Sequence, residues 1–117
     1  MAKMTRVAPE IPSADLQGAL AYYEQKLGFR VAMRMPAYAI IERDDVALHL
    51  FLDSSGQHSP IGIHIFCAEL DVICAELQRS GALLTQGIMR KSWGSRDFRV
   101  KDEFGNELKF TEPLEVN

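Results

Sequence analysis

The sequence of 117 residues lacks any long apolar run and any excess of positive charge. A helix that spans a bilayer needs roughly 18 or more consecutive apolar residues, and no run approaches that length, so we expect no membrane partner. Lys and Arg total 13 against 16 Asp and Glu, which gives a net charge of -3. Because nucleic-acid-binding domains are usually basic, the balance argues against nucleic acid and favours a small-molecule partner.

The first residues also lack the apolar core of a secretory signal peptide, since the chain begins Met1-Ala2-Lys3. We therefore expect a cytoplasmic protein. Cysteine is scarce: Cys67 and Cys74 form no Cys-x-x-Cys pair and stand at no zinc-finger spacing from a histidine. We interpret both as small core residues, as free cysteines commonly are, and expect no redox role.

What the sequence does contain is regular apolar periodicity, beginning in its first quarter. Residues 5–11 predict a short strand that ends at a proline-marked bend. Ser13 is then expected to cap a helix, with Asp15 in its first turn. One face of that helix is apolar and carries Leu16, Ala19, Leu20, Tyr23 and Leu27. Gly28 is expected to end the helix, because glycine readily adopts the left-handed conformation found there.

Three strands are predicted next, at residues 29–35, 38–42 and 46–52, with a turn at Arg43-Asp44-Asp45 between the last two. The last strand has apolar residues on both faces. Val46, Leu48, Leu50 and Leu52 share one face, and Ala47, His49 and Phe51 share the other. Such a strand is either buried on two sides or lines a ligand cavity with its second face.

Residues 54–60 are polar, contain Gly and Pro and show no periodicity, so they read as a linker. The order of elements then repeats: a strand at 61–67, a helix with Leu70, Ile73, Cys74 and Leu77 on one face that ends at Ser80-Gly81, a strand at 83–89, and a closing hairpin. We therefore predict an α+β fold of two paired β-α-β-β-β modules with curved mixed sheets. Module 1–53 and module 61–117 form one domain, because either alone is too small to bury much apolar surface.

The closing hairpin carries the only tryptophan at its mouth. Phe98 and Val100 alternate with charged residues, the Asp102–Asn106 stretch supplies a turn, and Phe110 returns to the same side. Trp93 stands beside Gly94, where an indole could stack on a flat ligand. It could equally close the end of the core, and the hairpin alone leaves both interpretations open.

Several strings in this order and spacing resemble the vicinal oxygen chelate superfamily, which includes glyoxalases, extradiol dioxygenases and bleomycin resistance proteins. They are Met1-Ala2-Lys3 leading into Pro9, Leu27-Gly28-Phe29, Arg43-Asp44-Asp45-Val46, Trp93-Gly94, and the Asp102–Asn106 turn with Phe110. Within the superfamily the chain looks most like the bleomycin-binding resistance proteins. The resemblance implies the paired-module fold derived above.

The resemblance also implies positions for a metal centre. The metal ligands of the superfamily fall by position on Ala8, His49, Gly62 and Lys109. Only His49 can ligate a metal there, whereas a catalytic centre needs three or more protein ligands. We therefore expect no metal, no cofactor and no catalytic residue. A register shift that brought His64 beside His49 could rebuild part of a metal site, and this alternative stays open.

Without a metal, the resemblance implies stoichiometric binding of a flat heteroaromatic drug in a groove between two subunits. The matching groove residues are Met33, Tyr38, His49, Phe51 and Trp93. Tyr38, Phe51 and Trp93 offer aromatic faces, Met33 a thioether and His49 a hydrogen-bonding tip. For Met33 and Phe51, packing in the core is the open alternative.

The leading hypothesis is therefore a homodimeric, non-enzymatic binding protein of the bleomycin-resistance type, in which the N-terminal strand with Pro9 is exchanged between subunits. The resistance proteins carry an acidic stretch suited to a cationic drug, whereas residues 32–37 here are apolar with Arg34 as the only charge. The ligand is bleomycin-like or another planar heteroaromatic. The alternatives are a metal-dependent glyoxalase-like lyase or dioxygenase and a catalytically empty partner-binding module.

Overall fold

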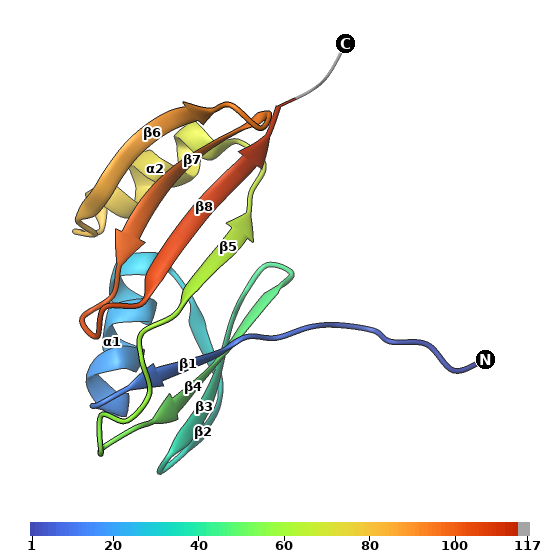
Figure 1. Cartoon of the computed structure of the whole chain (residues 1–117). Coiled ribbons are helices and arrows are strands. Elements are labelled where there is room, and N and C mark those ends of the chain that lie inside the picture. Colours follow the sequence, from blue (N-terminus) through green and yellow to red (C-terminus); the bar gives the residue numbers. More distant parts are fainter. Residues whose placement is uncertain (115–117) are drawn as a thin grey trace.

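Two four-stranded sheets organise the chain in the computed structural model, which describes residues 1–114 (Figure 1). The N-terminal sheet, in the order β1-β4-β3-β2, consists of β1 (Glu10–Ser13), β2 (Arg30–Met35), β3 (Tyr38–Arg43) and β4 (Val46–Leu52). The C-terminal sheet, in the order β5-β8-β7-β6, consists of β5 (Gly62–Phe66), β6 (Leu84–Lys91), β7 (Ser95–Lys101) and β8 (Glu107–Pro113). In each sheet the first strand runs parallel to the last and the other pairs are antiparallel.

Helix α1 (Leu16–Leu27) follows β1, and helix α2 (Leu70–Arg79) follows β5, so the element order repeats. This confirms the predicted α+β class with two β-α-β-β-β arrangements, while the module bounds at residues 53 and 61 stay a prediction. Neither of these two helices, within residues 1–114, is long and apolar enough to cross a membrane.

The start of α1 differs from the prediction. Asp15, and not Ser13, is the N-cap, and its side chain accepts a hydrogen bond from the backbone N–H of Gly18. Ser13 still belongs to β1, and its hydroxyl donates to the carbonyl of Phe51 at 3.3 Å. The predicted end is confirmed, because Gly28 closes the helix with φ of 74°.

The first strand also differs from its predicted position at residues 5–11. Strand β1 covers Glu10–Ser13, and residues 1–9 form an extended arm that leaves the body of the molecule (Figure 1). Pairing with β4 sets these bounds, since Glu10 lies opposite His49 and Ser13 lies opposite Leu52. Pro12 is tolerated inside β1 because the strand lies at the edge of its sheet.

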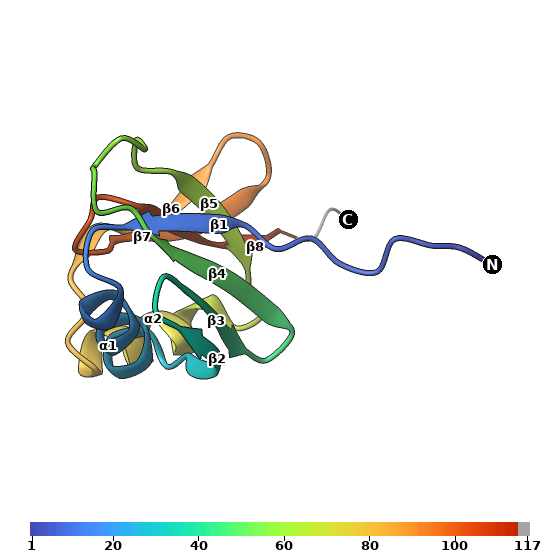
Figure 2. The ribbon, with the colours of Figure 1, turned by 90° about the horizontal axis from the view of Figure 1, so that it is seen from below.

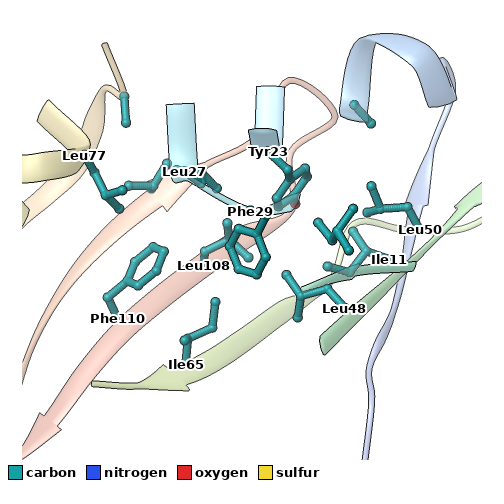
Figure 3. Packing of buried hydrophobic residues seen from close by; sticks show 14 of the residues in the cluster. Ile11, Tyr23, Leu27, Phe29, Leu48, Leu50, Ile65, Leu77, Leu108 and Phe110 are labelled. Carbon is teal, nitrogen blue, oxygen red and sulfur yellow. The ribbon is translucent and has the colours of Figure 1, made fainter. Parts of the chain in front are cut away.

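One hydrophobic core serves both sheets. Figure 2 shows α1 and α2 on the same side of the molecule, and Figure 3 shows that Leu27 of α1, Leu77 of α2, Leu48 of β4 and Leu108 of β8 belong to the same cluster. Cys74 is buried in this cluster and Cys67 packs against it, as predicted. Each sheet therefore has one face in the shared core and one face directed outward.

Polar contacts, two of them buried, connect the two halves as well. The Tyr23 hydroxyl on α1 donates to Oδ2 of Asp102 at 2.7 Å, and Asn106 Nδ2 donates to the carbonyl of Pro12 at 2.9 Å. Burial, reinforced by the Asp102 carboxylate, raises the pKa of Tyr23 above its usual range. Arg43 of β3 donates to Glu76 of α2 at 2.8 Å. These contacts fix the position of each sheet relative to the other.

Candidate functional site

The outward face of the N-terminal sheet gathers four of the five predicted ligand residues. Cross-strand pairing places Tyr38 opposite Phe51, and Ile40 opposite both His49 and Met33. Their sequence neighbours Ala39, Ile41, Leu48 and Leu50 are buried in the core, so alternation directs the first group outward. We call this surface the aromatic face; it consists of Glu10, Met33, Tyr38, Ile40, His49 and Phe51.

Met33 and Phe51 are half-buried, and the core cluster contains neither of them. The core-packing alternative therefore does not hold for these two residues. Phe51 also meets the His58 ring edge-on, with 5.0 Å between ring centroids and 81° between the ring planes. The His58 side chain, 62% exposed, lies 3.4 Å from Oδ1 of Asp53.

A chain of hydrogen bonds crosses the aromatic face from β1 to β3 to β4. The Tyr38 hydroxyl donates to Oε2 of Glu10 at 2.7 Å and lies 2.8 Å from Nδ1 of His49. The hydroxyl has a single proton, so it must accept the second bond from Nδ1–H. The bond to Glu10 also raises the pKa of Tyr38.

In the neutral imidazole, this arrangement leaves Nε2 of His49 without a proton, as an acceptor. The atom is buried and makes no hydrogen bond with any residue from 1 to 114. A buried polar atom without a partner is costly. The aromatic face therefore has an unused acceptor beside its rings, which a ligand N–H or O–H could satisfy.

Trp93 does not lie near these residues within one chain. It occupies the β6–β7 turn of the C-terminal sheet, at the end of that sheet that points away from the N-terminal sheet (Figure 1). Its side chain is 68% exposed, so it does not close the core. One chain thus brings together Met33, Tyr38, His49 and Phe51 and leaves Trp93 on a separate surface.

The outward face of the C-terminal sheet is polar and charged. The pairing register aligns His64 with Lys109, Lys109 with Arg99, and Arg99 with Gln86 in one row across all four strands. Ile63 and Ile65 pack in or against the core, so alternation directs His64 and Phe66 outward. We call this surface the polar face; it consists of His64, Phe66, Gln86, Lys91, Ser95, Asp97, Arg99, Glu107, Lys109 and Thr111.

Asp97 lies fully buried at the centre of the polar face. Its carboxylate accepts a hydrogen bond from Nε2 of Gln86 at 2.6 Å and lies 3.7 Å from Nζ of Lys91. Within residues 1–114, Oδ2 of Asp97, Nε of Arg99 and Oγ of Ser95 are buried and make no hydrogen bond. All three stand at alternate positions of β7, so one strip of this face has unused donors and acceptors.

Sequence reasoning missed this strip and the neighbouring Phe66. Phe66 is 66% exposed on the edge strand β5, and its ring stacks on His64 with centroids 6.0 Å apart. The alternation of Ile63 and Ile65 with His64 and Phe66 was the available signal. It places each residue on a face, but it does not show which strands stand side by side.

The residues do not fit the metal centre that the fold implies. Of the four corresponding positions, His49 lies on the aromatic face, whereas Gly62 and Lys109 belong to the C-terminal sheet and Ala8 to the arm. His64 shares the face of Lys109 and not that of His49. Residues 1–114 contain no group of three or more His, Cys, Asp or Glu side chains that could hold a metal ion.

Comparison with known proteins agrees with this architecture. The family model of the Glyoxalase/Bleomycin resistance protein/Dioxygenase superfamily matches residues 4–110. No curated protein matches the chain.

Solved structures of similar fold cover nearly the whole chain. A bleomycin resistance determinant encoded on transposon Tn5 superposes with a TM-score of 0.85 and 21% identity, over 97% of this chain and 100% of that one. The bleomycin-binding protein of Streptomyces verticillus, complexed with copper(II)-bleomycin, superposes with a TM-score of 0.77 and 21% identity, over 99% of this chain and 100% of that one. A lactoylglutathione lyase of Agrobacterium tumefaciens superposes with a TM-score of 0.77 and 16% identity, over 96% of each chain. Identities this low establish a shared fold.

Proposed function

Because the chain belongs to the glyoxalase/bleomycin resistance protein/dioxygenase superfamily, we propose that it is a non-enzymatic small-molecule binding protein of the bleomycin-resistance type. It sequesters a flat, aromatic, antibiotic-like ligand in a groove between two subunits. The observation that carries the proposal is the aromatic face: four of the five expected groove residues share one outward surface.

The chemistry of the aromatic face suits a planar heteroaromatic ligand. Tyr38 and Phe51 offer rings for stacking or edge contacts, and Met33 adds a polarisable thioether. Nε2 of His49 supplies an acceptor for a ring N–H or amide N–H. A ligand bound here covers apolar side chains and satisfies the unpartnered nitrogen at the same time.

A second subunit completes the groove in this proposal. The extended arm leaves Met1, Met4 and Val7 more than nine tenths exposed, which favours packing of the arm against another copy. Exchange of an N-terminal segment is a low-cost route to a symmetric dimer. The dimer would place the Trp93 turn and the polar face of one subunit opposite the aromatic face of the other.

The oligomeric state is the first test. Sedimentation velocity should give a dimer at micromolar concentration, and removal of residues 1–8 should shift it toward monomer, because the arm supplies the exchanged segment. Val72→Ser, which changes a side chain 58% exposed on α2, is the matched control and should leave the dimer intact. A monomeric full-length protein would contradict the proposal, since half of each groove would be absent.

Ligand binding is the second test, with the fluorescence of the single Trp93 as the readout. Bleomycin, phleomycin and a panel of planar heteroaromatics are titrated into the protein. At least one should quench Trp93, and Phe51→Ala should weaken its binding about tenfold, because each stacked aromatic contributes on the order of 1 kcal/mol or more. Leu83→Ala, which changes an exposed apolar side chain outside the aromatic face, should have no effect. Absence of quenching by every ligand would favour a partner-binding module.

Metal content separates the proposal from its enzymatic alternative, a metal-dependent glyoxalase-like lyase or dioxygenase built around His49 and His64. Elemental analysis of protein purified without chelators should give no stoichiometric Ni, Zn, Fe or Mn. A stoichiometric metal that disappears in His49→Ala would establish the alternative instead.

A further inference from the structure

The polar face contains a pair of cations that stand side by side. Arg99 on β7 lies directly opposite Lys109 on β8, and His64 on β5 lies opposite Lys109 on its other side. Directly opposed residues in a sheet have Cβ atoms about 5 Å apart, so a single small group can reach both cations. We call Arg99 and Lys109 the cationic row.

The hydrogen-bonding capacity of the cationic row is largely unused. Arg99 lies 3.6 Å from one oxygen each of Asp97 and Glu107, and Lys109 Nζ lies 3.9 Å from Glu107. These distances are longer than hydrogen bonds. Among the described residues, Nε of Arg99 is also one of the few buried side-chain atoms without any partner. The row is therefore neutralised only through these longer ion-pair contacts, and its donors can still bond to an acceptor on a ligand.

The charge balance of the ion-paired group around the row favours a monoanion. Three cations, Lys91, Arg99 and Lys109, contact two carboxylates, Asp97 and Glu107, which leaves one positive charge in excess within this group. The whole chain has a net charge of -3, so the excess is local. Asp97 is fully buried and already bonded to Gln86, which makes it a poor partner for a cationic ligand.

An aromatic surface adjoins the cationic row within the same chain. Phe66 stands two residues from His64 on β5, and the two rings stack with 23° between their planes. His64 is fixed by a 2.9 Å hydrogen bond from Nδ1 to the Thr111 hydroxyl, which itself donates to the carbonyl of Lys109. A ring that packs on Phe66 and His64 would thus hold a substituent near Lys109.

We propose that the cationic row binds the carboxylate of an aromatic ligand, so that the ligand class of this protein is the planar aromatic carboxylates. The guanidinium fork of Arg99 matches the two oxygens of a carboxylate, and Lys109 adds a second charge. The inference rests on the proposed binding function and names its ligand class. It agrees with residues 32–37, where Arg34 is the only charge and no acidic stretch is present for a cationic drug.

The test uses a pair of probes of equal shape, naphthalene-2-carboxylate and its neutral amide. Calorimetric titration of the full-length protein at low salt should show the carboxylate bound about tenfold more tightly than the amide, as expected for hydrogen bonds to charged groups. High salt should reduce the preference, because the row is partly exposed and therefore screened.

Variants that remove one charge each identify the residues responsible for the preference for carboxylate over amide. Lys109→Gln and Arg99→Gln should each remove most of the tenfold preference, and Arg99→Lys should restore part of it. Lys101→Gln is the matched control: it removes one positive charge two residues beyond Arg99 on β7, from an exposed side chain outside the ion-paired group, and should leave the preference unchanged. Glu107→Gln should increase the preference, because it removes the carboxylate that competes for both cations.

The outcomes separate this inference from the proposed function. Equal affinity for carboxylate and amide, with Trp93 quenching intact, would overturn the anionic ligand class and leave the binding function standing. A preference that Lys101→Gln abolishes as strongly as Lys109→Gln would also overturn the inference, since it would reflect net charge alone. Failure of both probes and of every heteroaromatic to bind would overturn both proposals together.

Discussion

The two sheets share a strand order, a helix position and one core, yet their outward faces have opposite chemistry. The aromatic face presents Met33, Tyr38, Ile40 and Phe51, whereas the polar face surrounds a buried Asp97 with Arg99, Lys91 and Gln86. The buried faces are alike because both must fill the same core. The repeated topology therefore constrains the inner faces, and the outer faces are free to differ.

The two helices are also held in different ways. Helix α1 is fixed through a buried hydrogen bond, from Tyr23 to Asp102. Helix α2 packs in the same core but has an ion pair at the surface, where Arg96 of β7 pairs with Asp71 of α2 and with Glu112 of β8. A buried neutral donor and an exposed ion pair respond differently to substitution and to pH, so the comparison between the halves can be tested directly.

The largest expected effect tests whether the core is shared. Leu48 of β4 and Leu108 of β8 are both fully buried, and either Leu→Ala change should cost about 2–5 kcal/mol of unfolding free energy. Both variants should unfold in one cooperative transition in denaturant, followed by circular dichroism. A second transition confined to one variant would show that the halves fold independently and would break the comparison.

The next effect concerns the anchor of α1. Tyr23→Phe removes the 2.7 Å hydrogen bond to Asp102 and leaves a buried carboxylate with one donor fewer. We expect a loss of about 1.5–3 kcal/mol, the usual range for a hydrogen bond to a charged group. Denaturant unfolding measures it, and Tyr38→Phe on the aromatic face is the control. Equal costs for the two variants would mean that the buried contact has no special role.

The sequence predicted the parts of the fold that local pattern determines. The apolar positions of α1, the left-handed Gly28 and the strand at residues 46–52 appear as expected. The first strand does not, because its bounds depend on pairing with β4, which is non-local. Ser13 was expected to cap α1, and it remains in β1 for the same reason.

In the candidate site, too, local pattern was predictable from the sequence and pairing between distant strands was not. Alternation within residues 46–52 placed His49 and Phe51 together on one face, and the structure confirms that placement. The cationic row was not foreseen, because Arg99 and Lys109 come from different strands and only the register makes them neighbours. Whether the five predicted residues bind a ligand stays a prediction.

Alkaline pH should weaken the attachment of α1, where the hydroxyl of Tyr22, next to Tyr23, donates to the carbonyl of Lys101 at 3.1 Å. Burial, then the carboxylates of Asp102 and Glu103, raises the pKa of Tyr22 from 10.0 to about 12. A pKa that is higher in the folded state stabilises the protein fully below the unfolded value and ceases to do so as pH rises through the folded value. Unfolding free energy should therefore fall between about pH 10 and about pH 12. Tyr22→Phe should reduce that fall, and Tyr23, whose pKa is raised as well, accounts for the part that remains. An unchanged slope would contradict the assignment.

Acid should weaken the anchor of α2 instead, with the smallest effect of the series. Hydrogen bonds and charge from Arg96 lower the pKa values of Asp71 and Glu112 below their usual range. Carboxylates with a lowered folded-state pKa stabilise the protein above the unfolded values and lose that contribution as pH falls through the folded ones. Because the Asp71 side chain is 69% exposed, solvent screens most of the gain. Arg96→Gln should therefore change the unfolding free energy little near neutral pH. It should also reduce the loss of unfolding free energy between about pH 5 and about pH 2, which denaturant unfolding measures. A large loss at neutral pH would mean that α2 depends on its ion pairs as strongly as α1 depends on its buried hydrogen bond.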